Sequence, residues 1–232
     1  NTKYIDIDGD DNTKVYAYDK YICVYRKKVL EFYNRAGEKS GSIELSINNP
    51  MFTTAGRYLA ICEENGQKFY LITGKEKVFE NEIEGNIKQI NVSKNGYVSV
   101  VISNTSYKSI VDVFDGSGKE IFKTNLMSRV VDISISQDNK YLAIAEVDLS
   151  GIIIKSRIQI ISIELAKTDS EKAIQYKYEA TNNKLIMNIE YQEQNNLICM
   201  YNDSVDILQE QNNKEIESFK NKKISFMTVQ LN

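Results

Sequence analysis

The chain of 232 residues contains no His, no Trp and a single Pro, Pro50. Without an imidazole it has no Ser-His-Asp or Cys-His nucleophile pair, no His-ligated zinc site and no histidine pH switch. These absences exclude most familiar hydrolases and metalloenzymes. The sequence therefore says more about architecture than about activity.

A basic surplus is also missing. The chain has 29 Lys and Arg against 32 Asp and Glu, a net charge of −3, and its pI is about 5.3. A nucleic-acid-binding protein normally has a basic face and a high pI. We therefore expect no nucleic-acid partner, and we interpret the basic cluster Arg26-Lys27-Lys28 as a solvated hairpin turn.

Cysteine is scarce, and long apolar runs are absent. The three cysteines, Cys23, Cys62 and Cys199, lie inside short apolar segments, which predicts buried free thiols rather than disulfides. No apolar run reaches the roughly 18 residues of a membrane-spanning helix, and no signal-peptide pattern opens the chain. The first residue is Asn1 rather than Met, which leaves room for a preceding targeting or anchor segment.

Short β-branched and aromatic runs, separated by Gly, Asn, Asp and Ser, recur along the chain, whereas helical spacing is hard to find. One unit of four predicted strands covers residues 86–93, 97–102, 109–115 and 119–124. A similar second-strand motif recurs about every 40 residues, and farther apart near the end. Its members are Tyr21, Tyr58, Tyr97, Tyr141 and Leu197. We attribute the longer spacing to polar insertions at 147–155 and 166–172 and expect both on one face.

Repeats of this length and strand content are typical of a β-propeller with four-stranded antiparallel blades. We predict an all-β fold with an N-terminal segment at residues 1–13 and a propeller at 14–232. The propeller would have about five blades, plus the first strand of a sixth at 222–230. An open arc exposes strand edges, so we expect continuation beyond Asn232 or edge pairing with another chain. A two-sheet sandwich is the structural alternative, but it does not explain the repeated turns.

The turn and outer strand Gly118-Lys119-Glu120-Ile121-Phe122 resemble quinoprotein-like and WD40-like propeller repeats, with Phe79 and Phe122 where a Trp usually stands. The stretch from 86 to 165 is similar to a family of uncharacterised propeller proteins of low-GC Gram-positive bacteria. The bias toward Ile, Asn and Lys favours the same source. That resemblance implies an N-terminal membrane anchor outside this chain and an extracytoplasmic propeller at the cell membrane. It implies no catalytic residues.

Two local patterns suggest binding. Asp6, Asp8, Asp10 and Asn12 alternate as the oxygen ligands of a Ca²⁺ loop do. However, Asp11 replaces the usual Gly and Ala17 the usual Glu, so a solvated acidic segment is the alternative to a Ca²⁺ site. Tyr107 and Lys108 lie in a predicted loop between strands, where exposed aromatic and basic side chains can contact a protein partner.

No catalytic constellation emerges from the remaining residues. The acid pairs Glu63-Glu64 and Asp112/Asp115 are interpreted as ordinary strand-end residues rather than glycosidase acids. Gly116-Ser117-Gly118-Lys119 lacks the spacing of a phosphate-binding loop and is expected to be a hairpin turn.

We therefore expect a non-catalytic extracytoplasmic propeller without a cofactor, which acts through an unknown protein partner or as a cell-envelope scaffold. One alternative is a ligand-binding, carbohydrate-binding or enzymatic propeller with a site in its central channel. The other is a cytosolic scaffold.

Overall fold

The computed structural model describes residues 7, 13–169, 172–181, 184–210 and 212–219. These residues form five antiparallel sheets of four strands each, and within every sheet the strands follow chain order. An all-β fold was predicted, and the five separate sheets rule out the two-sheet sandwich. The predicted strand at 222–230 lies outside the described residues.

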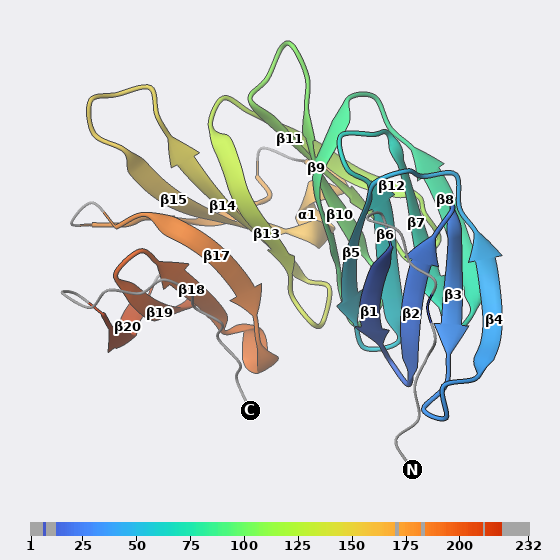
Figure 1. Ribbon diagram of the computed structural model, residues 1–232. Coiled ribbons are helices and arrows are strands. Elements are labelled where there is room, and N and C mark those ends of the chain that lie inside the picture. The colour runs from blue at the N-terminus through green and yellow to red at the C-terminus, as the bar shows by residue number, and fades with distance from the viewer. Residues whose placement is uncertain (1–6, 8–12, 170–171, 182–183, 211, 220–232) are drawn as a thin grey trace.

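The strands are named in chain order (Figure 1). Sheet 1 contains β1 (Lys14–Tyr18), β2 (Tyr21–Arg26), β3 (Val29–Tyr33) and β4 (Lys39–Glu44). Sheet 2 contains β5 (Pro50–Ala55), β6 (Tyr58–Glu63), β7 (Lys68–Thr73) and β8 (Glu76–Glu82). Sheet 3 contains β9 (Asn86–Val92), β10 (Val98–Ser103), β11 (Ser109–Phe114) and β12 (Glu120–Leu126).

The last two sheets are joined to the only helical turns among the described residues. Sheet 4 contains β13 (Arg129–Ile135), β14 (Tyr141–Asp148), β15 (Lys155–Ser162) and β16 (Ile174–Glu179), with the short helix α1 (Ile163–Ala166) after β15. Sheet 5 contains β17 (Ile186–Tyr191), β18 (Leu197–Tyr201), β19 (Ser204–Gln209) and β20 (Asn212–Ser218), with the 3-10 turn η1 (Glu193–Asn195) after β17.

The sheets follow one another around an arc, so that sheets 1 and 5 stand at its two ends (Figure 1). Neighbouring sheets meet through their first strands, with β5 against β9, β9 against β13, and β13 against β17. The fourth strands are the most exposed: β8 and β20, for example, bury none of their side chains completely. The first strands therefore line the inside of the arc and the fourth strands its outside, as in the blades of a propeller.

The hydrophobic core is divided into layers between sheets, because each middle strand is apolar on both faces. Four buried clusters join sheets 1 and 2, 2 and 3, 3 and 4, and 4 and 5. Tyr58, at the start of β6, packs against Gly96 in the β9–β10 turn of the next sheet. Phe79 on β8 packs against Gly118, and Phe122 on β12 is buried against sheet 4. Repeated aromatic residues thus fix the contact between one sheet and the next.

The antiparallel course of the chain gives the molecule two rims. On the turn rim, the first strand of each sheet is joined to the second and the third to the fourth. On the loop rim, the second strand is joined to the third, and the fourth leads to the next sheet. The expectation that the two insertions share a face is wrong: 149–154 lies on the loop rim and the connection after α1 on the turn rim. The first insertion is also apolar rather than polar, because it exposes Leu149 and three isoleucines.

Candidate functional site

The inner strands surround a central hollow of about 280 Å³. Its walls come from β5, β9, β13 and β17, and its polar side chains include Thr53, Asn91, Asp132, Ser134 and Glu190. Small polar side chains dominate because the apolar residues of the first strands point into the layers between sheets. Sequence reasoning placed the alternative ligand site in this channel without naming residues.

Asp132 is the most perturbed carboxylate of the channel. It accepts hydrogen bonds from its neighbour Ile133 N (2.9 Å), from Ile189 N on β17 (2.9 Å) and from Asn188 Nδ2 (2.6 Å). Burial outweighs these bonds and raises the pKa of Asp132 to about 6. Three donors from two adjacent sheets hold the Asp132 carboxylate, so Asp132 links β13 to β17. Its oxygens are therefore already occupied and are poorly placed to bind a ligand.

Serine side chains make comparable links between sheets. Ser134 Oγ accepts from Tyr191 N (3.0 Å), Ser156 Oγ from Ile186 N (3.0 Å) and Ser109 Oγ from Val130 N (2.9 Å). Each serine satisfies a backbone N–H of the next sheet's first strand. Asp132 and Ser134, which line the channel, thus both join sheet 4 to sheet 5.

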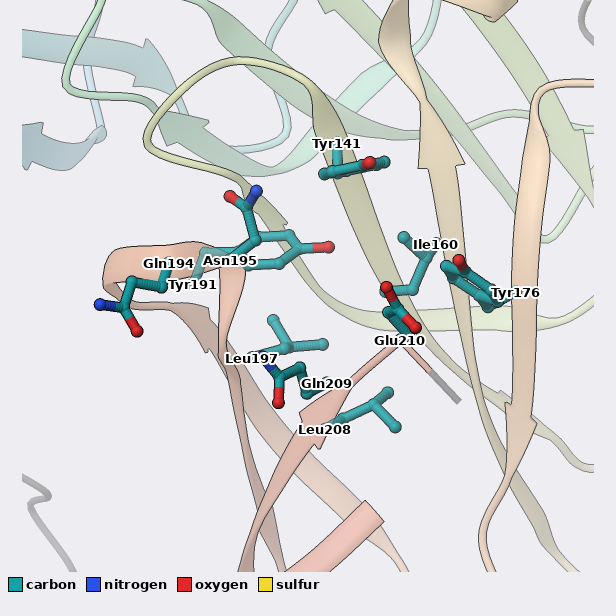
Figure 2. A pocket seen from close by; sticks show the side chains of 10 residues that line it. All are labelled: Tyr141, Ile160, Tyr176, Tyr191, Gln194, Asn195, Leu197, Leu208, Gln209 and Glu210. Carbon is teal, nitrogen blue, oxygen red and sulfur yellow. The ribbon is translucent and has the colours of Figure 1, made fainter. Parts of the chain in front are cut away.

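A second hollow, a crevice of about 160 Å³, lies between sheets 4 and 5 on the turn rim (Figure 2). The rings of Tyr141, Tyr176 and Tyr191 surround it, and Gln209 and Glu210 at the end of β19 line its floor. Burial raises the pKa of Tyr191, so that phenol stays protonated. Aromatic faces beside amide and carboxylate groups can bind a small polar ligand with an apolar face, such as a sugar.

Tyr107 and Lys108 lie where the sequence placed them, in the β10–β11 loop, and both are exposed. Asn104 Oδ1 accepts hydrogen bonds from Ser106 N and Tyr107 N, both at 2.9 Å, and so fixes the loop backbone. Lys108 interacts electrostatically with Asp148 at the end of β14. The predicted pair therefore sits beside the β14–β15 loop on the loop rim.

The other sequence-predicted groups contribute no site among the described residues. Asp6, Asp8, Asp10 and Asn12 lie outside the described part of the chain. Within that part, no group of three or more His, Cys, Asp or Glu side chains could hold a metal ion. Glu63 and Glu64 accept hydrogen bonds from Asn48 and Asn49.

Asp112 is fully buried and forms an ion pair with Lys123 at 2.9 Å. Burial raises its pKa to about 7 despite that partner. Asp115 instead holds the β11–β12 turn, because its Oδ1 accepts from Ser117 N (2.8 Å) and Lys119 N (3.1 Å). The two acids therefore have separate structural roles.

All three cysteines are buried and free. Burial raises the pKa of Cys23 and of Cys62 to about 12, and it also raises the pKa of Cys199. Thiols that stay protonated are poor nucleophiles. The predicted structural role of these cysteines agrees with their environment.

Solved structures with a similar fold include a WD40 domain and a propeller. Hsv2 of Kluyvelomyces marxianus aligns with a TM-score of 0.62 at 14% identity, over 91% of this chain and 74% of that one. The WD40 domain of Pan2 from Neurospora crassa aligns with a TM-score of 0.57 at 10% identity, over 87% of this chain and 63% of that one. The propeller of Dos1 aligns with a TM-score of 0.57 at 10% identity, over 90% of this chain and 70% of that one. The chain thus has a β-propeller fold that resembles the WD40 fold, and it spans about two thirds to three quarters of these structures.

Residues 1–230 match a family of unknown function (DUF5711), and the chain belongs to that family. No curated protein matches it. The identities of 10–14% to the solved structures show the fold alone. Neither helical turn of the described part has the length and apolar character of a membrane-spanning segment.

Proposed function

We propose that this chain is the non-catalytic, extracytoplasmic propeller of a membrane-anchored protein of a low-GC Gram-positive bacterium. It serves as a protein-interaction scaffold, and its contact surface is the loop rim of sheets 3 and 4. The observation that carries the proposal is the WD40-type fold, which suggests a protein-interaction scaffold. The packed Phe79 and Phe122 support repeats of the quinoprotein-like kind.

The contact surface is chosen because it departs from the repeat. Tyr107 and Lys108 are exposed on a loop whose backbone is already fixed by Asn104, so binding would order few residues. Tyrosine supplies contact area and a hydroxyl group at a small entropic cost. The rim therefore has side chains suited to a protein contact.

A non-catalytic role is supported by the state of the chain's acids and thiols. Asp132 is held by three N–H donors, Asp112 by Lys123, and the cysteine thiols are buried. The chain contains no histidine to replace them as a general base.

The location rests on the resemblance to membrane-anchored propellers, and protease treatment of intact cells tests it. We expect the full-length protein to sediment with membranes and to be digested from outside. Recovery in the soluble fraction, protected from protease until lysis, would favour the cytosolic scaffold instead.

The scaffold role is tested by capture of the full-length protein from its own membranes. The double variant Tyr107→Ala/Lys108→Ala is expected to recover about tenfold less of a specific partner, because removal of an aromatic anchor typically weakens binding by that much or more. The matched control Leu165→Ala/Lys167→Ala removes an exposed apolar and an exposed basic side chain from the turn rim. Equal recovery of every partner by both variants would refute the role of Tyr107 and Lys108.

A second candidate function is carbohydrate binding in the crevice of Figure 2, favoured by its three tyrosine rings. Titration calorimetry with mono- and oligosaccharides should then show saturable heat that Tyr176→Ala abolishes. Absence of heat with every sugar, or heat that Tyr176→Ala leaves unchanged, would rule out the crevice as a sugar site.

A further inference from the structure

The β14–β15 hairpin is built from longer strands than its counterparts. Both strands have eight residues, whereas the equivalent strands of the other sheets have five or six. The connecting loop rises from the loop rim as the yellow hairpin of Figure 1. Its strands are the longest second and third strands among the described sheets.

The tip of this hairpin is apolar and uncovered. Ile152 is fully exposed, Ile153 and Ile154 are 61% and 50% exposed, and Leu149 is 52% exposed. No charged side chain stands between Asp148 and Lys155. Four adjacent aliphatic side chains in water are unfavourable unless something covers them. We call residues 149–154 the apolar tip.

The apolar tip is supported by a fixed base. Asp148 Oδ1 accepts hydrogen bonds from Ser150 N (2.9 Å) and Ser150 Oγ (2.6 Å), which shapes the start of the loop. Below it, Asp148 and Lys155 are paired in the ladder, and Lys155 forms an ion pair with Glu179 at 3.3 Å. These contacts fix the start of the loop and the strands at its base.

The surroundings of the tip are amphipathic. Tyr107 and Lys108 lie on the same rim, and the Lys108 charge acts on Asp148 at the base of the tip. Met127, at the end of the neighbouring β12, is 69% exposed on the same rim. Tyrosine and lysine both place an apolar stem beside a polar end, which suits the boundary between headgroups and acyl chains.

We propose that the apolar tip inserts into the interfacial layer of a lipid bilayer. A projecting loop, bounded by Lys108 and Lys155, can enter a bilayer without a complementary groove. A protein interface instead needs a broad matching surface, and the hollow that Ile152, Ile153 and Ile154 form with Leu185 and Asn202 is open to solvent. Backbone polar groups in the irregular loop need water, so the insertion stops near the headgroups.

The expected binding is weak. The four aliphatic side chains carry about as many carbon atoms as one myristoyl chain, which gives an association constant of about 10⁴ M⁻¹. Stable attachment takes a second membrane signal. Insertion is nevertheless independent of any anchor, so the chain as it stands is enough to test it.

Tryptophan fluorescence gives a direct test, because the chain has no Trp of its own. Ile153→Trp is mixed with phosphatidylcholine vesicles, with and without phosphatidylglycerol. We expect a blue shift of its emission and quenching by brominated acyl chains. The matched control Val78→Trp, at a 41% exposed position on the outer strand β8, should show neither. An unchanged Ile153→Trp spectrum with both vesicle types would overturn the proposal.

Vesicle sedimentation gives an independent test. Ile152→Ser/Ile153→Ser/Ile154→Ser should bind at least tenfold more weakly than the parent chain, whereas Val78→Ser/Ile216→Ser should bind equally. Binding that persists in the triple variant, or that needs phosphatidylglycerol at low salt, would assign the interaction to headgroup charge and overturn insertion. A blue shift produced only by a protein partner would overturn it in favour of a protein groove.

Discussion

The two rims of this propeller are built from the same strands but differ in regularity. On the turn rim, the turns between first and second strands of sheets 3 and 4 are close copies: Gly96 N bonds to Ser93 O, and Asn139 N to Ser136 O. Ser93 Oγ and Ser136 Oγ also accept hydrogen bonds from the backbone N–H groups of Tyr97 and Tyr141. On the loop rim, the β2–β3 connection has two residues and the β14–β15 connection six.

This difference separates framework from function. Turn-rim residues recur because each packs against the next sheet, as Gly96 does against Tyr58. Loop-rim connections differ in length from sheet to sheet, and the exposed tyrosine and isoleucines are found there. Some of them also bond to the next sheet, as Ser109 and Ser156 do. Substitutions should therefore affect stability on one rim and binding on the other.

The largest loss of stability should come from a residue that is an exception to this division between the rims. Lys184 precedes β17 on the loop rim, but its Nζ is buried and lies 3.1 Å from Asp206 and 2.9 Å from Glu215. Lys184→Met leaves the fully buried Asp206 without its cation and should lower the free energy of unfolding by about 3–5 kcal/mol. Urea denaturation measures the loss.

The control for Lys184 is a surface ion pair. Lys77→Met removes the partner of Glu80, where both side chains are about 40% exposed, and should cost about 0.5 kcal/mol or less. Equal losses in the two variants would show that the cluster around Lys184 is solvated.

The second largest loss of stability should come from a substitution on the turn rim. Gly96 has φ +81°, and an added Cβ would lie 2.9 Å from the Tyr58 ring. Gly96→Ala therefore combines strain with overpacking and should cost about 2–4 kcal/mol. Gly74→Ala, at φ +59° with open space around it, should cost only about 1 kcal/mol. Thermal unfolding of the two variants side by side distinguishes packing from backbone strain, and indistinguishable midpoints would remove the packing explanation.

The third effect concerns the channel. The pKa of Asp132 is raised to about 6 from an ordinary 3.8, so the native state binds a proton that the unfolded state has already released. Stability should fall as the pH rises from about 4 to about 6 and then level off, by up to about 3 kcal/mol.

Asp132→Asn tests this pH dependence, because an amide does not titrate. Denaturation between pH 4 and 7 should show a shallower fall in the variant, with the remaining slope due to Asp112, whose pKa is raised to about 7. Parallel curves for the two proteins would mean that Asp132 ionises at its ordinary pKa in the fold.

The smallest effect on stability should come from the loop rim of sheets 3 and 4. Tyr107→Ala/Lys108→Ala should change the free energy of unfolding by about 0.5 kcal/mol or less, because both side chains are exposed. Calorimetry checks this expectation. A loss above about 2 kcal/mol would place the pair in the framework.

Much of the framework could be predicted from the sequence because packing repeats. Tyr21, Tyr58, Tyr97 and Tyr141 all pack between sheets, so their spacing marked the blades. The Gly118 turn was visible because its residues are adjacent in the chain. The alternation of apolar and polar residues in a strand and the residues of a turn are close together in the chain. A single sequence therefore shows them.

The channel and the crevice could not be predicted, because they join residues distant in the chain. Asp132 meets Asn188 and Ile189 only after two sheets have folded, and neither partner stands out in its own strand. The apolar tip was missed for another reason. Ile152-Ile153-Ile154 has the composition of a buried strand, and only the structure shows that it extends beyond the sheet.

Photo-crosslinking in intact cells tests most directly whether binding belongs to the loop rim. A benzophenone amino acid replaces Tyr107 on the loop rim or Leu165 on the turn rim, two positions of similar exposure, 37% and 43%. We predict a discrete protein adduct from position 107 and none from position 165. An adduct from position 165 alone, or none from either position, would contradict the division between framework and binding rim.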